Sequence, residues 1–216
     1  MYLTLIATSV LVLYAISRAS IVSFFLILYC FSVISKNTAL RKTLNYLLLA
    51  IILFILVTLN GNVKDFILSS ILFTNSSSLT HVVAWIESIS TILNNPLGIG
   101  LGTSGNVANA TSSSVGGENQ FFIIGIQVGI IPMLVYGYLY YYIIKLAKRS
   151  FGVYNGKIKK LALFIFLVKI GLLIPALTSE IESYVYISYF TWFFSGYLIN
   201  LLSNNKLVNN FGKESN

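Results

Sequence analysis

The chain has 216 residues, of which 56% are hydrophobic and only 9% are charged, with a mean hydropathy of +0.84 and a net charge of +8. A water-soluble domain averages about 25% charged residues, so lipid must cover much of this protein's surface. A net positive charge is typical of nucleic-acid-binding proteins. Here the basic residues lie in short segments between apolar runs, which excludes a nucleic-acid-binding protein. The single Cys30 lies inside an apolar run, so the chain has no disulfide framework.

Six apolar runs predict an all-α integral membrane protein with six transmembrane helices, because a spanning helix needs about 20 residues. They cover residues 2–16, 19–34, 44–59, 121–144, 161–177 and 184–202. Residues 2–34 as one helix would be about 50 Å long, well beyond a hydrocarbon core of about 30 Å, so we expect a hairpin at Ser17-Arg18. The chain is then one membrane domain, with three transmembrane helices in 1–59, a large outer loop in 60–120, three more helices in 121–203 and a tail in 204–216.

The basic residues predict the orientation. On a six-helix path, eleven of the fourteen Lys and Arg residues fall on one side. These are Lys36, Arg41, Lys42, Lys145, Lys148, Arg149, Lys157, Lys159, Lys160, Lys206 and Lys213. The positive-inside rule makes that side cytoplasmic, so both termini are expected there and the long loop on the outer side.

Within the outer loop, residues 63–73 and 81–93 are expected to form short helices. The second follows Ser and Thr residues that suit a helix N-cap and ends before Asn94-Asn95-Pro96. Residues 98–105 carry four glycines and predict irregular backbone, which at a membrane face is tolerated only where it is buried in protein or wet.

Four pieces of the chain are notable for their order and spacing. They are Ser17-Arg18, His81-Val-Val-Ala-Trp85, Asn95-Pro-Leu-Gly-Ile-Gly-Leu-Gly102 and Glu118-Asn-Gln-Phe-Phe122 with Gly125 and Gly129. Together they resemble the O-antigen polymerase and ligase superfamily of bacterial membrane glycosyltransferases. The resemblance covers roughly residues 10–145. Family members usually have about twice this length, so the chain resembles their C-terminal half, and we expect a truncated or partner-dependent protein.

The resemblance implies a metal-independent enzyme without cofactors, in the bacterial inner membrane. It would transfer a glycan from a polyprenyl-diphosphate donor to another lipid-linked repeat unit at the outer face, as an O-antigen or capsular polysaccharide polymerase. Its partners would be that lipid-linked glycan, membrane lipid and chain-length regulator or flippase proteins. The alternatives are a ligase of the same superfamily, a non-catalytic membrane protein and a flippase-type transporter component. Glu118 stands where the ligases carry His, which favours the polymerase.

Arg18 and Glu118 are the candidate catalytic residues. The guanidinium of Arg18 suits a diphosphate because it binds phosphate oxygens bidentately and keeps its charge; its alternative role is an interfacial anchor. Glu118 is the candidate base for the acceptor hydroxyl, and its alternative role is a helix-capping acid. His81 occupies a position that is commonly Arg in the family.

His81, Trp85, Asn119, Gly100 and Gly102 are the candidate substrate-binding residues. His81 can hydrogen-bond a phosphate or sugar, Trp85 one turn later can stack on a sugar ring, and the glycine stretch can present backbone N–H groups to an anion. A structural histidine and an interfacial tryptophan are the alternatives. Lys169, inside the fifth run, is an unexplained intramembrane charge. The sequence shows no metal-ligand cluster.

Overall fold

The computed structural model of the protein describes residues 18–57, 76–109, 115–116 and 118–214. All regular structure within these ranges is helical, and no strand occurs in them. Three helices are long and apolar enough to cross a membrane, namely α8 (Ile130–Val153), α9 (Gly156–Thr178) and the Val185–Asn204 part of α10 (Val185–Glu214). The all-helical prediction is confirmed for the described residues. The expected helices at 2–16 and 63–73 lie outside them.

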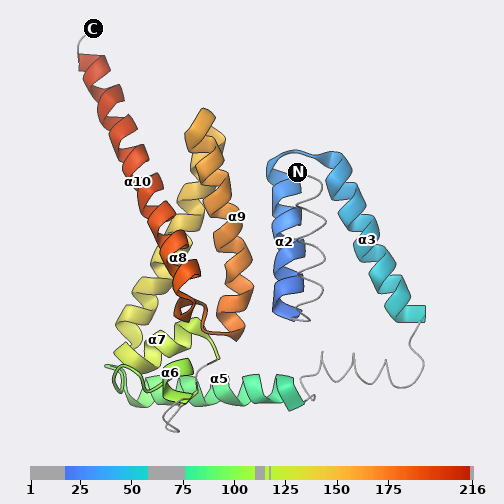
Figure 1. The fold of residues 1–216 in the computed structure, drawn as a ribbon, viewed down its shortest axis with the longest axis vertical. Helices are drawn as coiled ribbons and strands as arrows, with labels where there is room; N and C mark the ends of the chain where they lie inside the picture. The colour runs from blue at the N-terminus through green and yellow to red at the C-terminus, as the bar shows by residue number, and fades with distance from the viewer. Residues whose placement is uncertain (1–17, 58–75, 110–114, 117, 215–216) are drawn as a thin grey trace.

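The long helices run side by side, and the short ones gather at one end (Figure 1). Helices α2 (Arg18–Ile34) and α3 (Thr38–Val57) form a hairpin beside α8, α9 and α10, with α2 packed against α9. Helix α5 (Ser76–Asn94) lies across the lower end in Figure 1, next to α7 (Gln120–Val128). The α2–α3 turn and the α8–α9 turn lie at the opposite end, where the chain is rich in lysine and arginine.

The interior lies between α8, α9 and α10. Its fully packed members are small or aliphatic, apart from one phenylalanine. They are Ile143, Ala147, Ala162, Ile165, Phe166, Leu198 and Leu202. The alanines let the helix backbones approach closely, as small residues do in membrane proteins generally. Large apolar side chains on the outer faces, such as Leu134 and Phe193, remain exposed, which suits contact with lipid.

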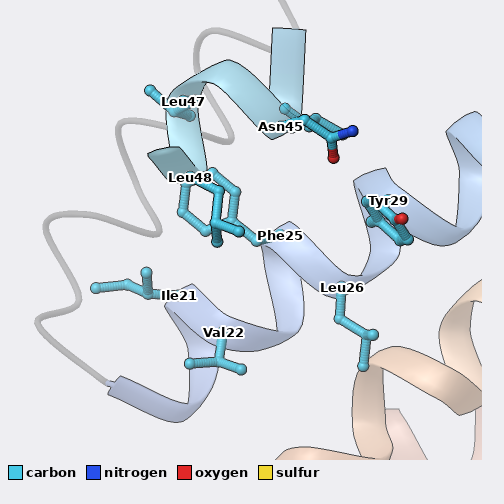
Figure 2. Close-up of a pocket in the computed structure, with 9 residues that line it drawn as sticks. Ile21, Val22, Phe25, Leu26, Tyr29, Asn45, Leu47 and Leu48 are labelled. Carbon is cyan, nitrogen blue, oxygen red and sulfur yellow. The ribbon is translucent and has the colours of Figure 1, made fainter. Parts of the chain in front are cut away.

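The hairpin turn between α2 and α3 has a local cause. Lys36 adopts a left-handed conformation with φ of 56°, which ends α2, and the side-chain oxygen of Asn37 accepts a hydrogen bond from Leu40 N at 3.0 Å, which caps α3. Beyond the turn, the two helices leave a groove of about 370 Å³ between them (Figure 2). Its lining is aliphatic and aromatic except for Asn45 and the hydroxyl of Tyr29.

The fourth apolar run, residues 121–144, was predicted as one transmembrane helix, but the structure divides it into two helices, α7 and α8. Gly129 separates α7 from α8, with φ of 96° and ψ of 173°, a conformation that no α-helix contains. A side chain here would meet Pro96, because an added Cβ would lie 2.5 Å from its carbonyl oxygen. A loop from elsewhere in the chain therefore packs directly against the break, and the apolar pattern does not reveal this contact.

Candidate functional site

Four of the predicted site residues lie on the two sides of the contact between α5 and the segment that leads into α7. They are His81, Trp85, Glu118 and Asn119. His81, Trp85, Ser88 and Ile92 fall on one face of α5, spaced by three or four residues. Ser88 lies against Gly116, and Ile92 against Gly125, where an added Cβ would come within 2.7 Å of the Ile92 Cδ1 atom. The C-terminal half of α5 is thus fixed by packing against Gly116 and Gly125, and this orients the helix face that carries His81 and Trp85.

His81 and Glu118 contact each other directly, Nδ1 of the imidazole against Oε2 of the carboxylate. The two atoms that touch are shielded from solvent. The side chains as a whole remain 35% and 40% exposed, so a substrate can reach the pair. The structure therefore brings together two candidates that the sequence separates by the whole glycine-rich segment.

The helix-capping role falls to Asn119 and not to Glu118. The side-chain oxygen of Asn119 accepts hydrogen bonds from Phe121 N at 2.9 Å and Phe122 N at 3.3 Å, which makes it the N-cap of α7. Asn119 is itself buried. Because the cap is filled by its neighbour, the Glu118 carboxylate is free to contact His81.

Trp85 packs beside the pair. Its ring lies edge to face with Phe122 of α7, with ring centroids 6.4 Å apart. Its indole Nε1 is buried, and among the described residues it has no hydrogen-bond partner. An indole N–H usually finds a partner when it is buried, so this donor is an unusual feature at the edge of the site.

The glycine segment docks onto the junction of α7 and α8 through backbone hydrogen bonds. Ile99 N donates to Ile126 O at 2.8 Å, Gly100 N to Gln127 O at 3.1 Å, and Ile130 N to Pro96 O at 3.0 Å. Gly98, with φ of 84°, has no room for a side chain, because an added Cβ would lie 2.6 Å from Gln127 O. The Gly100 N–H predicted to face an anion is therefore engaged within the protein; Gly102, with φ of 77°, lies in the turn that follows.

Glu180 binds the part of the loop that follows the glycine segment, at residues 105 and 106. Its carboxylate accepts a hydrogen bond from Asn106 N at 2.7 Å, at the start of α6 (Asn106–Asn109), and occupies the space beside Gly105. Helix α9 continues through Pro175 to Thr178, so Lys169 and Glu180 stay apart. This role of Glu180 was not predictable from the sequence, because nothing near Glu180 identifies a backbone N–H of residue 106 as its partner.

Glu182 and Lys169 belong to a cluster of side chains inside the bundle that sequence reasoning missed. Glu182 lies in η1 (Ile181–Ser183) and accepts hydrogen bonds from the Tyr136 hydroxyl at 2.6 Å and Trp192 Nε1 at 3.0 Å. The Lys169 ammonium lies 3.8 Å from the centre of the Trp192 ring and 4.8 Å from that of Tyr140. Lys169 is only 1% exposed. Its charge is thus stabilised by aromatic rings, and Trp192 links it to the carboxylate.

Arg18 is the first residue of α2. Helix α2 begins at the end of the molecule where α5 and α7 lie (Figure 1). Its side chain lies outside the described part of the structure, so its predicted role stays a prediction. No group of three His, Cys, Asp or Glu side chains gathers as a metal site within the described ranges.

No protein-family model matches the chain, no curated protein matches it, and no solved structure matches it.

Proposed function

We propose that this chain is a multi-pass glycosyltransferase of the O-antigen polymerase type. It transfers a glycan from a polyprenyl diphosphate to another lipid-linked repeat unit at the outer face of a bacterial inner membrane. The contact between His81 and Glu118 is the observation that carries the proposal. An imidazole and a carboxylate in contact, partly open to solvent, form a group that can remove a proton from an acceptor hydroxyl.

The proposed topology has six spans and cytoplasmic termini. Three helices have the length and composition of spans. The distribution of charge supports the orientation, because the turns at one end of the bundle are rich in lysine and arginine, while α5, α7 and η1 lie at the other end (Figure 1). On this topology the His81–Glu118 pair faces the outer side, where lipid-linked glycans are polymerised.

Glycosyl transfer from a lipid diphosphate requires a cation for the leaving group and a base for the acceptor. In the proposed enzyme Arg18 provides the cation, and its fork of N–H donors matches the diphosphate oxygens. The His81–Glu118 pair provides the base, and Trp85 beside it offers an aromatic surface for a sugar ring. No metal ion is required, because a guanidinium can neutralise the charge that develops on the diphosphate.

A ligase of the same superfamily is the second candidate. The resemblance associates the ligases with a histidine at the position of Glu118, and the structure brings the imidazole of His81 to the carboxylate at that position. The transporter alternative has less support. Lys169, its main argument, is packed against Trp192 and Tyr140 inside the bundle and does not line an open path.

Deletion of the gene tests the proposal. We expect the cells to carry single-repeat glycan in place of the ladder of chain lengths, and the wild-type gene to restore the ladder. An unchanged ladder would contradict both candidate functions. If polymer forms normally but stays on the polyprenyl carrier and does not reach its final lipid or protein acceptor, the ligase is correct and the polymerase is wrong.

Complementation with Arg18→Lys tests the proposed cation. The substitution keeps the charge and removes the bidentate fork, so we expect at least a tenfold loss of polymer. Full activity of this variant would make Arg18 an interfacial anchor.

A further inference from the structure

The Nδ1 atom of His81 faces a carboxylate, and this determines what the rest of the ring can do. When Glu118 is ionised, its carboxylate only accepts hydrogen bonds, so a favourable contact requires a proton on the Nδ1 atom of His81. In a neutral imidazole the other nitrogen, Nε2, then has a free lone pair. Nε2 has no hydrogen-bond partner among the residues that the structure describes. The imidazole is therefore held in the tautomer that can accept a proton from a substrate.

The two members of the pair are held differently. His81 lies on α5, whose face is locked by the Ser88–Gly116 and Ile92–Gly125 contacts. Glu118 precedes the N-cap of α7 and contacts no other charged side chain among the described residues. Its Oε2 atom is covered by the imidazole. The Oε2 oxygen is thus poorly placed to remove a proton from a substrate, whereas Nε2, on the far side of the imidazole, is open to one.

We propose that His81 is the general base of the transfer reaction and that Glu118 is a positioning residue. This assignment rests on the proposed function. The acceptor hydroxyl loses its proton to His81 Nε2 while its oxygen forms a bond to the anomeric carbon. The bond from that carbon to the diphosphate oxygen breaks, and the polyprenyl diphosphate leaves with the electron pair. Glu118 holds the ring through Nδ1–H and stabilises the imidazolium, which afterwards releases its proton to water or to the diphosphate.

The experiment compares variants of the full chain in proteoliposomes with a lipid-linked repeat unit as donor and acceptor. In His81→Ala we expect kcat to fall at least about 100-fold while KM changes less than about threefold, since general-base catalysis typically contributes 10²–10⁴-fold. Added imidazole should restore part of the activity of His81→Ala and none of that of Glu118→Ala. His81→Gln should be as inactive as His81→Ala, because an amide fills the space but does not take up the proton.

The Glu118 variants separate positioning from catalysis. The amide oxygen of Glu118→Gln can still accept from Nδ1–H, so we expect it to retain activity within about tenfold of the wild type, whereas Glu118→Ala loses more. Combining Glu118→Ala with His81→Ala should give no further loss, because the two residues act as one unit. Glu87→Gln, an exposed acid on the same helix, is the matched control and should leave the rate unchanged. Tryptophan fluorescence, with Trp85 beside the pair, confirms that each variant is folded.

Two outcomes would overturn the assignment in different ways. If the wild-type protein transfers glycan but Glu118→Gln is inactive and His81→Ala retains most activity, Glu118 is the base and only the division of roles is wrong. If the wild-type protein transfers no glycan at all, the proposed function fails and the assignment fails with it.

Discussion

The α2–α3 hairpin and the α8–α10 bundle are both strongly apolar, yet they are packed in different ways. In the bundle, Ala147, Ala162 and Ala176 are fully buried between helices. In α3 no described side chain is buried, and large residues such as Tyr46 and Leu48 are 69% and 62% exposed. Apolarity is therefore common to both regions, whereas buried small residues distinguish the helices that pack closely against other helices.

The end of α7 should be the most sensitive point of the better-packed region. Gly129→Ala introduces a Cβ 2.5 Å from Pro96 O at a φ of 96°. Backbone strain and overpacking together should cost about 2–6 kcal/mol of the free energy of unfolding. Thermal unfolding in detergent, followed by tryptophan fluorescence, measures the change. Gly152→Ala, where an added Cβ meets nothing within 4 Å, is the matched control and should keep or raise the midpoint.

A pair of alanine substitutions tests the contrast between the two regions directly. Ile165→Ala empties a site in the bundle core that is 2% exposed and should cost about 2–5 kcal/mol. Leu48→Ala on α3 should change the free energy of unfolding by less than about 0.5 kcal/mol, because its side chain packs against little protein. Equal losses in the same unfolding assay would show that α3 is held by contacts as tight as those of the bundle.

Gly171 lies where the α8–α10 bundle packs against the α2–α3 hairpin. An added Cβ at this position of α9 would run into the side chain of Ile27 on α2. We expect Gly171→Val to destabilise the protein by about 1–3 kcal/mol. Adding Ile27→Ala should recover part of the loss, and a double-mutant cycle measures the recovery. Gly196→Val, with nothing within 4 Å of its Cβ, provides the control for valine in a membrane helix.

The smallest expected effect concerns the cap of α7. Asn119→Ala removes the acceptor for Phe121 N and Phe122 N and should cost about 0.5–2 kcal/mol. Asn119→Ser should keep most of the stability, because its hydroxyl oxygen can also cap a helix. Hydrogen exchange at the amides of Phe121 and Phe122 should be faster in the alanine variant only. Unchanged exchange there would mean that packing, and not the cap, holds the first turn of α7.

The sequence predicted the long helices well because their apolar runs are continuous and local. It also placed a helix near residues 81–93, where α5 runs from Ser76 to Asn94. It did not predict the break at Gly129, because the apolar run continues through the glycine and the segment that packs against the break, at Pro96, is distant in the sequence. The same limit applies to Lys169, whose partners Trp192 and Tyr140 lie on other helices.

The residues of the candidate site could be predicted from the sequence, but the contacts between them could not. Residue type and motif order selected His81, Trp85 and Glu118, and the structure places the first and last in contact. The sequence left two roles open for Glu118, base or cap. The dihedral angles and hydrogen bonds of Asn119 exclude the cap, and the role that we propose for Glu118, positioning His81, was not among the two. A contact between residues so far apart in the chain depends on tertiary packing, which local patterns do not encode.

The way the glycine segment, residues 96–102, binds the α7–α8 junction determines which of its residues can be substituted. The segment is held by its backbone, while Leu97 and Leu101 point outward and are 85% and 79% exposed. A saturation scan across residues 96–102 should therefore give an alternating profile, with free substitution at the leucines and rejection at Gly98. A homologue could lose all recognisable similarity at the leucines and still build the same anchor from the glycines alone.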